Sequence, residues 1–133
     1  METGEEQIAV GFGDTDAAGV IFYPRALALA HSAVENFIRR STLGWKAWFA
    51  SAEHAGPIRR AEADFFLPIR VGETVMLRTA VEQVGETSVT FVVEFLDTSG
   101  RSAVRVRTVH VVIDKATGRP APLTVEMRRA FGA

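Results

Sequence analysis

The part of the sequence that decides the fold is residues 12–40, which read FGDTDAAGVIFYPRALALAHSAVENFIRR. After Pro24 this stretch contains no Gly and no further Pro, and its apolar residues recur at three- and four-residue steps. Such spacing places apolar side chains on one face and predicts a long helix with a buried side. Pro24 suits the first helical turn, and Arg39 and Arg40 suit the negatively polarised C-terminal end. The apolar residues that carry this pattern are Leu27, Ala30, Val34, Phe37 and Ile38.

The segments on either side of this helix favour strands. The short apolar segment 7–12 predicts a first strand, which ends at the turn-forming residues 13–19. Residues 45–57 predict a short second helix and a loop. Strands are then expected over 58–69, 73–84, 87–96 and 101–114, separated by compact turns. The order predicts an α+β fold, in which an antiparallel sheet carries one long helix on one face.

Length and composition exclude several classes of protein. A chain of 133 residues is expected to form a single domain over residues 1–133. Its net charge of -1 argues against a nucleic-acid protein held by a basic face, and the lack of cysteine excludes disulfides, cysteine zinc sites and thiol nucleophiles. Met1–Gln7 contains no apolar run, so we expect no signal peptide, no membrane span and a cytoplasmic location. An uncovered sheet face and free edge strands predict self-association.

Few residues offer reactive chemistry. His31, His54 and His110 are scattered and form no metal-binding motif, and the sequence lacks the nucleophile-elbow and phosphate-loop patterns. Asp14 and Asp16 remain, in a small-residue turn just ahead of the long helix. A helix N-terminus presents free N–H groups and partial positive charge, so a nearby carboxylate can attack, or activate water to attack, a carbonyl polarised there. The alternative is that both aspartates are turn and capping residues.

Residues 12–24 closely resemble the active-site signature of hotdog-fold acyl-CoA thioesterases of the 4-hydroxybenzoyl-CoA thioesterase family. The resemblance extends over roughly residues 8–114 and includes the long helix, the segment Gly56-Pro57-Ile58, the pair Asp64-Phe65 and residues 108–114. It implies the hotdog fold, in which an antiparallel sheet wraps around one long helix.

The resemblance also implies catalytic roles. Asp16 matches the catalytic carboxylate, acting as nucleophile or general base, whereas Asp14 does not match it and is expected to be structural. Tyr23 matches the residue whose backbone N–H binds the thioester oxygen. Gly19 is expected to permit a close turn, because a side chain there would crowd both groups. No metal or redox cofactor is required, since the coenzyme A thioester is itself the substrate.

The substrate-binding residues implied by the resemblance are Phe22, His31, Gly56, Pro57 and Ile58. The spacing of His31 from Leu27 and Val34 predicts that it lies on the buried helix face, where it could contact the acyl group. The alternative is a partly buried histidine satisfied by a backbone carbonyl. The benzoyl-type pattern carries an aspartate at this position, so the acyl specificity stays open.

Positive charge is expected where the phosphates of coenzyme A bind. Arg59 and Arg60 are the candidates, and Arg105 with Arg107 share one face of a strand. The alternative for each pair is solvated surface. The basic hairpin cluster of benzoyl-type relatives is replaced by residues 85–87, which carry a glutamate. Trp45 and Trp48 are interpreted as packing residues.

The sequence therefore predicts an acyl-CoA thioesterase for an aromatic acyl group: 4-hydroxybenzoyl, a related benzoyl, or 1,4-dihydroxy-2-naphthoyl. The alternatives are hydrolysis of short aliphatic acyl-CoAs, a hotdog dehydratase that pairs His31 with a carboxylate, and a non-catalytic acyl-CoA-binding protein. We expect a homodimer with sites between subunits, or a homotetramer, with no nucleic-acid or membrane partner.

Overall fold

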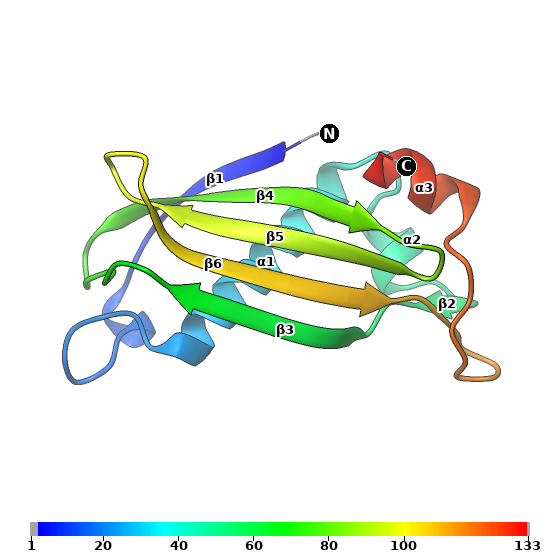
Figure 1. The fold of residues 1–133 in the computed structure, drawn as a ribbon, viewed down its shortest axis with the longest axis horizontal. Helices are drawn as coiled ribbons and strands as arrows, with labels where there is room; N and C mark the ends of the chain where they lie inside the picture. Colours follow the sequence, from blue (N-terminus) through cyan, green and yellow to red (C-terminus); the bar gives the residue numbers. More distant parts are fainter. Residues whose placement is uncertain (1–2, 133) are drawn as a thin grey trace.

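The computed structural model describes residues 3–132, which form a five-stranded antiparallel sheet with one long helix lying across it (Figure 1). The strands follow the order β1-β4-β5-β6-β3, and a separate two-stranded pair joins β2 to β7. This arrangement confirms the predicted α+β class. The elements are β1 (Thr3–Ala9), the 3-10 turn η1 (Phe12–Asp14), α1 (Tyr23–Arg40), α2 (Trp45–Phe49), β2 (His54–Ala55), β3 (Ile58–Phe65), β4 (Thr74–Val84), β5 (Ser88–Leu96), β6 (Ser102–Val111), β7 (Ile113–Asp114) and α3 (Val125–Phe131).

Several features differ from the sequence prediction. The strand expected over 58–69 ends at Phe65. The first strand is Thr3–Ala9 rather than 7–12, because it pairs along its length with β4 while Phe12 enters a 3-10 turn. The last predicted strand divides into β6 and β7, which pair with different partners. The C-terminal helix α3 was not predicted. It begins where the Thr124 hydroxyl oxygen accepts the Met127 N–H at 3.1 Å, and it is held by buried Met127 and Phe131.

The strand β3 does not pair with β4, which follows it in the chain. Residues 66–73 instead run around one end of the sheet, at the left of Figure 1, and β3 lies beside β6 at the edge. The edge position leaves one side of β3 without a neighbouring strand in the described chain, so its outward backbone groups can pair with another strand.

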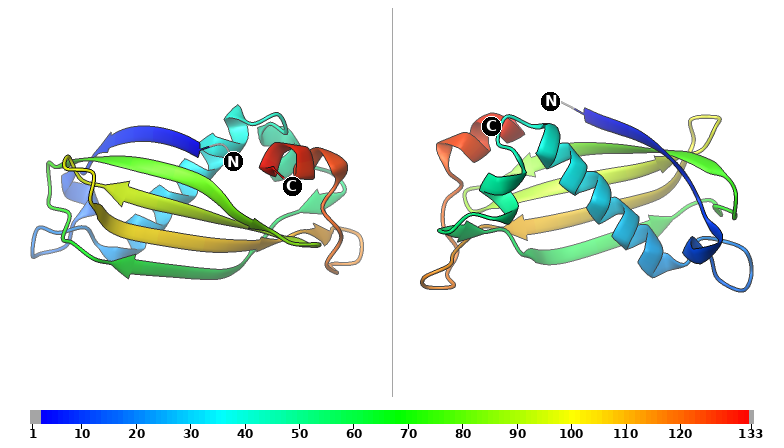
Figure 2. Two further views of the ribbon diagram at one scale, coloured as in Figure 1. Left: turned by 45° about the horizontal axis from the view of Figure 1, so that its top comes forward. Right: turned by 180° about the vertical axis from the view of Figure 1, so that it is seen from behind.

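The core lies between α1 and one face of the sheet, as the view from behind shows (Figure 2). Alternate residues of β5 point toward the helix, and the rings of Phe91 and Phe37 meet edge to face at 6.0 Å. The helix contributes small side chains to this contact, so it packs close to the curved sheet. Its buried residues are Ala26, Ala30, Ala33, Val34, Phe37 and Ile38. No helix within residues 3–132 is both long and apolar enough to cross a membrane.

The outer face of the sheet is charged. Five residues of alternating sign stand in register across all five strands: Glu5, Arg78, Glu94, Arg105 and Asp64. Arg78 pairs with Glu5 at 3.0 Å, and Arg105 approaches Glu94 at 3.7 Å. Because these charges pair with one another across the outer face of the sheet, that face does not need an apolar cover. One of the two sequence arguments for self-association, the uncovered sheet face, therefore no longer applies. The free edges of β1 and β3 remain as the other.

Candidate active site

The signature residues fold into a short hairpin. The Asp16 N–H donates to the Val20 carbonyl oxygen at 2.9 Å, Thr15 bridges Ile21, and the Phe22 N–H donates to the Asp14 oxygen at 2.9 Å. This ladder joins the carboxylate-bearing turn directly to the start of α1.

The conformation of Gly19 closes this hairpin. Its φ angle is +78°, a left-handed value that side-chain-bearing residues rarely adopt, and a Cβ placed there would meet no atom within 4 Å. The expectation that a side chain would crowd the site was therefore wrong. Glycine is required here for its backbone conformation.

A second set of contacts holds the hairpin against the crossover segment. The Ile21 N–H donates to the Ile69 oxygen at 2.7 Å, and the Val71 N–H donates to the Gly19 oxygen at 3.1 Å. Ile21 and Ile69 are both buried. The hairpin consequently sits at the end of the molecule where β3 finishes, at the left of Figure 1.

Asp16 is exposed in the single chain. Its Oδ1 atom accepts the Ala18 N–H at 2.9 Å, which orients the side chain across the turn. No ion pair to Asp16 is present within residues 3–132. A carboxylate with this freedom can act on a bound molecule.

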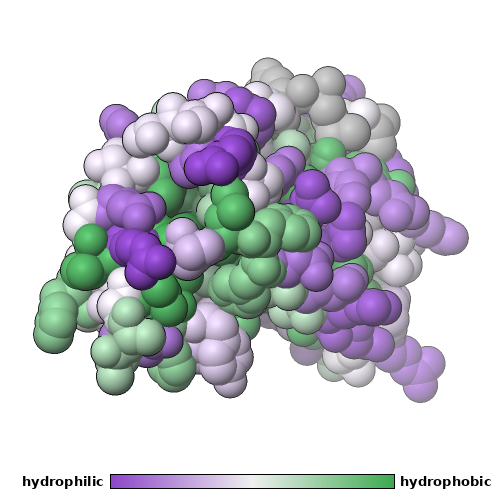
Figure 3. All heavy atoms as spheres, turned by 60° about the vertical axis from the view of Figure 1, so that its left-hand side comes forward, coloured by the Kyte–Doolittle hydropathy of each residue, from purple (hydrophilic) through white to green (hydrophobic). Residues whose placement is uncertain are grey.

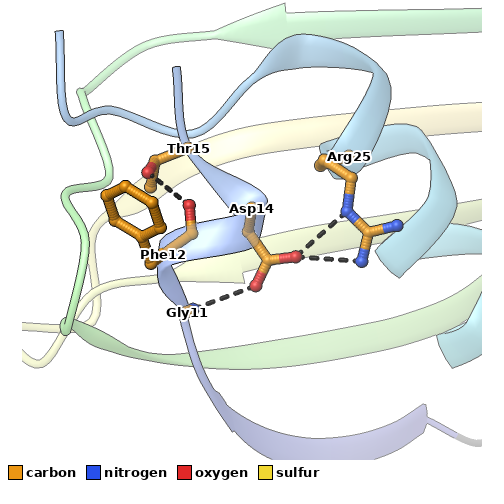
Figure 4. A network of polar contacts seen from close by, with 5 residues as sticks. All are labelled: Gly11, Phe12, Asp14, Thr15 and Arg25. Atoms are coloured by element: carbon orange, nitrogen blue, oxygen red, sulfur yellow. Dashed lines mark hydrogen bonds and ion pairs between the residues drawn. The ribbon is translucent and has the colours of Figure 1, made fainter. Parts of the chain in front are cut away.

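Both oxygens of the Asp14 carboxylate are engaged by other groups of the chain (Figure 4). Its Oδ2 accepts the Gly11 N–H at 2.9 Å, and its Oδ1 accepts Arg25 Nε at 3.0 Å and lies 2.9 Å from Arg25 Nη2. The Gly11 N–H, together with Arg25, lowers the pKa of the Asp14 carboxyl below its ordinary value. These contacts confirm the structural role predicted for Asp14. Arg25 was not identified from the sequence. A cation in the first turn of a helix is unfavourable at the positive end of the helix dipole, so it indicates that a carboxylate lies nearby.

Only one amide at the start of α1 is available to a ligand. Pro24 has no N–H, and the N–H groups of Arg25 and Ala26 both donate to the Phe22 oxygen, at 2.8 and 3.3 Å. Within the described chain the Tyr23 N–H has no such acceptor. The helix therefore directs a single donor, reinforced by its dipole, toward the end of the molecule that carries Asp16.

Exposed apolar side chains surround this end of the molecule, which Figure 3 brings forward. Phe12 is 87% exposed, and the rings of Phe22 and Tyr23 meet edge to face at 5.5 Å. Surfaces with several large exposed apolar groups usually bind a ligand or another chain. This apolar rim consists of Phe12, Phe22, Tyr23, Phe65, Phe66 and Val71.

His31 does not lie on the buried face, so that prediction was wrong. It is exposed on the flank of α1, about 140° around the helix axis from Ala26, and its ring meets Phe49 edge to face at 6.2 Å. Asn36, on the opposite flank, bonds Glu6 of β1 at 3.1 Å. Because β1 and β3 are the outer strands of the sheet, His31 faces the β3 side.

The other predicted binding residues lie at the far end of β3. Gly56, Pro57, Ile58, Arg59 and Arg60 precede or begin this strand, whereas the Asp16 hairpin contacts the segment that follows it. Eight extended residues span about 23 Å, so one chain does not bring the two groups together. Arg60 pairs with Glu62 at 3.2 Å. Arg107 forms two bonds with Glu82, at 2.5 and 2.8 Å, which favours the solvated-surface interpretation of this arginine.

A buried cluster fixes the segment that begins at Gly56. His110 is 2% exposed; its Nδ1 lies 3.0 Å from the Gly56 oxygen, and its Nε2 lies 3.2 Å from the Thr108 hydroxyl oxygen. A Cβ on Gly56 would overlap the indole of buried Trp48, which confirms the packing role of that tryptophan. The burial of His110 was not predicted from the sequence. The signal that could have shown it is its position in β6, where it alternates with less buried residues in step with the buried Val104 and Val106. No group of three or more metal-ligating side chains occurs within residues 3–132.

A sheet curved around one helix, with a carboxylate-bearing hairpin at the helix N-terminus, is the layout of a hotdog-fold thioesterase. The family model described as the thioesterase-like superfamily matches residues 10–131, and the chain belongs to this superfamily. The family and the hotdog fold expected from the sequence are thereby confirmed.

Relatives and solved structures agree with this assignment. The chain is 30% identical over 117 residues to a 1,4-dihydroxy-2-naphthoyl-CoA hydrolase of Rippkaea orientalis, covering 86% of this chain and 85% of the relative. It is 33% identical over 109 residues to a protein of the same name from Gloeothece citriformis, covering 79% and 75%. A crystal structure of a 1,4-dihydroxy-2-naphthoyl-CoA thioesterase from Synechocystis matches with a TM-score of 0.88 at 25% identity, covering 98% of this chain and 96% of that one.

Proposed function

We propose that this protein hydrolyses the thioester of an aromatic acyl-CoA to the free acid and coenzyme A. The relatives named above act on 1,4-dihydroxy-2-naphthoyl-CoA, and another similar structure, at 25% identity and a TM-score of 0.82, is a gentisyl-coenzyme A thioesterase. Both acyl groups are hydroxylated aromatic rings. The aromatic acyl-CoAs predicted from the sequence are therefore the substrates to test first.

The observation that supports a mechanism is that the start of α1 offers one free amide, that of Tyr23, at the end of the molecule where the Asp16 carboxylate is exposed and forms no ion pair within residues 3–132. The thioester oxygen accepts the Tyr23 N–H, which stabilises the negative charge that develops there; one such donor contributes about 3–4 kcal/mol to lowering a comparable barrier. Asp16 then attacks the thioester carbon, or removes a proton from the water that attacks it. The carbon–sulfur bond breaks and coenzyme A leaves as a thiolate. In the first route, water then hydrolyses the anhydride formed with Asp16.

A second copy of the chain completes the substrate site. If the free edge of β3 pairs antiparallel with the same strand of another copy, the start of one β3 lies beside the end of the other. That brings Gly56, Pro57, Ile58 and Arg59 of one chain to the Asp16 hairpin of its neighbour. His31 faces the same side of the sheet, so it is directed toward the side on which the second copy binds.

Charge selects the register of this pairing. Arg60, Glu62 and Asp64 share the outer face of β3, and residues directly opposite must share a face. If Ala61 of one chain lies opposite Ala61 of the other, Arg60 of each chain lies opposite Glu62 of its neighbour, which gives two pairs of opposite charge. Placing Glu62 opposite itself would also give two favourable pairs, Arg60 with Asp64, but it would add a repulsive pair of glutamates at the centre. The first register is the one we propose; a homotetramer and a cytoplasmic location stay predictions from the sequence.

A panel of thioesters tests the function. Purified protein is assayed with 4-hydroxybenzoyl-, 1,4-dihydroxy-2-naphthoyl- and butyryl-CoA, and the released thiol is trapped with a chromogenic reagent. We expect kcat/KM to be higher for the aryl substrates. Equal or faster cleavage of butyryl-CoA would support the aliphatic alternative, and tight binding without thiol release would support a non-catalytic acyl-CoA-binding protein.

Asp16→Asn tests the mechanism. This change removes the charge and preserves the shape, so turnover should fall by more than about 10³-fold while the protein stays folded. Asp97→Asn is a matched control, because Asp97 also accepts backbone N–H groups in an exposed turn. Near-normal turnover of Asp16→Asn would exclude the mechanism.

A further inference from the structure

The two groups of the proposed site belong to different elements, which are joined by the backbone ladder of the hairpin and by its contacts with residues 69–71. Asp16 lies in an exposed hairpin of three backbone contacts, and Tyr23 opens α1. A hairpin this short is only marginally stable by itself. Catalysis requires the carboxylate and the oxyanion donor to hold a fixed geometry, since small displacements are costly in rate. Backbone bonds already hold the hairpin to Phe22 and to residues 69–71, and a side-chain contact with α1 would fix the direction of the helix start as well.

Asp14 makes that contact through both its backbone and its side chain. Its carbonyl oxygen holds the Phe22 N–H, the amide next to that of Tyr23, at 2.9 Å. Its carboxylate holds the Gly11 N–H on one oxygen and the Arg25 guanidinium on the other (Figure 4). One residue thus connects the chain before the turn, the base of the hairpin and the first turn of α1.

Electrostatics favour this arrangement over other positions for Arg25. The first turn of α1 contains no acidic residue and its N-cap makes no side-chain hydrogen bond, so Arg25 would otherwise be an isolated cation at the positive end of the helix. The Asp14 carboxylate supplies the missing negative charge. Two guanidinium nitrogens on one carboxylate oxygen also restrict the direction of approach, because the planar fork of arginine fixes its own geometry.

We propose that the Asp14–Arg25 ion pair is a positioning clamp, which sets the Asp16 carboxylate against the Tyr23 amide. This inference rests on the proposed function. Neither side chain of the pair touches the substrate; the clamp acts through the geometry of the hairpin and the helix start. Loss of the pair should therefore slow the chemical step and leave substrate affinity nearly unchanged.

Four variants test the clamp by steady-state kinetics on the preferred thioester. Asp14→Asn keeps an oxygen for the Gly11 N–H but removes the charge that holds Arg25, and Arg25→Gln removes the other partner. Each should lower kcat about tenfold with KM within about twofold. The double variant should lose no more than either single one, because all three break the same contact. Arg25→Lys, which keeps the charge, should recover part of the loss.

The controls come from an equivalent pair elsewhere. Asp97 accepts the N–H groups of Ser99 and Arg101 and the Arg101 Nε at 2.9 Å, in the turn between β5 and β6. Asp97→Asn and Arg101→Gln should leave kcat unchanged, and circular dichroism should show all variants folded. The clamp is refuted if kcat of Asp14→Asn and Arg25→Gln stays within twofold of wild type, or if their losses multiply in the double variant. Asp16→Asn, assayed alongside, reports separately on the proposed function.

Discussion

The Nδ1 atom of His110 lies 3.0 Å from the carbonyl oxygen of Gly56, in a part of the core where the histidine is 2% exposed. A carbonyl oxygen only accepts, so Nδ1 carries the proton and Nε2 accepts the Thr108 hydroxyl. The rings of Phe91 and Trp48 meet the imidazole edge to face at 5.3 and 6.0 Å. This neutral histidine connects β6 to the segment that begins β3.

Stability should depend on pH through His110. Burial lowers the pKa of His110 below 6.5, outweighing the Gly56 oxygen, which raises it; the nearby His31 also lowers it. The unfolded chain therefore binds the proton first. The free energy of unfolding should fall as pH drops below about 6.5, by at most about 1.4 kcal/mol per pH unit. Urea unfolding at pH 7.5, 6.5 and 5.5 measures this, and His110→Gln should reduce the slope. An unchanged slope in the variant would assign the effect to another group.

Gly56→Ala should destabilise the protein through Trp48. The added Cβ would overlap one atom of the Trp48 indole and stand 2.9 Å from two others, and this ring is buried against His110 and Phe131. Overpacking of this kind costs about 1–3 kcal/mol. Thermal unfolding should show the loss, and combining the change with Trp48→Phe should recover part of it. Gly13→Ala is the control, because a Cβ at Gly13 meets nothing within 4 Å. Equal stability of the Gly56 and Gly13 variants would contradict the packing argument.

Gly19→Ala should impair both stability and catalysis. A side chain at φ +78° costs about 1–2 kcal/mol, and relief of that strain would distort the hairpin that carries Asp16. We expect kcat to fall several-fold. Gly118→Ala introduces the same strain, at φ +71°, in the turn after β7, and should cost similar stability without changing kcat. Equal kcat values for the two variants would show that the hairpin tolerates a change of conformation.

The proposed register predicts how charge controls assembly. In the proposed register Arg60→Glu would replace both Arg60–Glu62 pairs between the chains with pairs of glutamates. The dimer should therefore dissociate at higher protein concentrations than wild type. The swap Arg60→Glu with Glu62→Arg restores opposite charges and should restore the dimer. Sedimentation velocity over a concentration series measures the shift. If Arg60→Glu assembles as wild type does, the register or the strand is different.

Local signals made much of the molecule predictable. The apolar spacing of residues 27–38 depends only on the 3.6-residue period of a helix, so the extent of α1 followed from the sequence. The turn residues at 85–86 and 97–100 likewise placed the hairpins of β4, β5 and β6. Asp16, Gly19 and Tyr23 could be placed together in one turn and helix start because they lie within eight residues of one another in the chain.

The sequence by itself determined the long helix, the antiparallel strands and the pairing of a carboxylate with a helix N-terminus, because each depends on residues close together in the chain. The tertiary structure decided that β3 lies beside β6, that Arg25 holds Asp14, and that His31 faces outward on the β3 side of the sheet. Those outcomes depend on which surfaces meet after the chain has turned back on itself. A periodic pattern identifies a buried face, but the partner that buries it is fixed only when every other segment has taken its place.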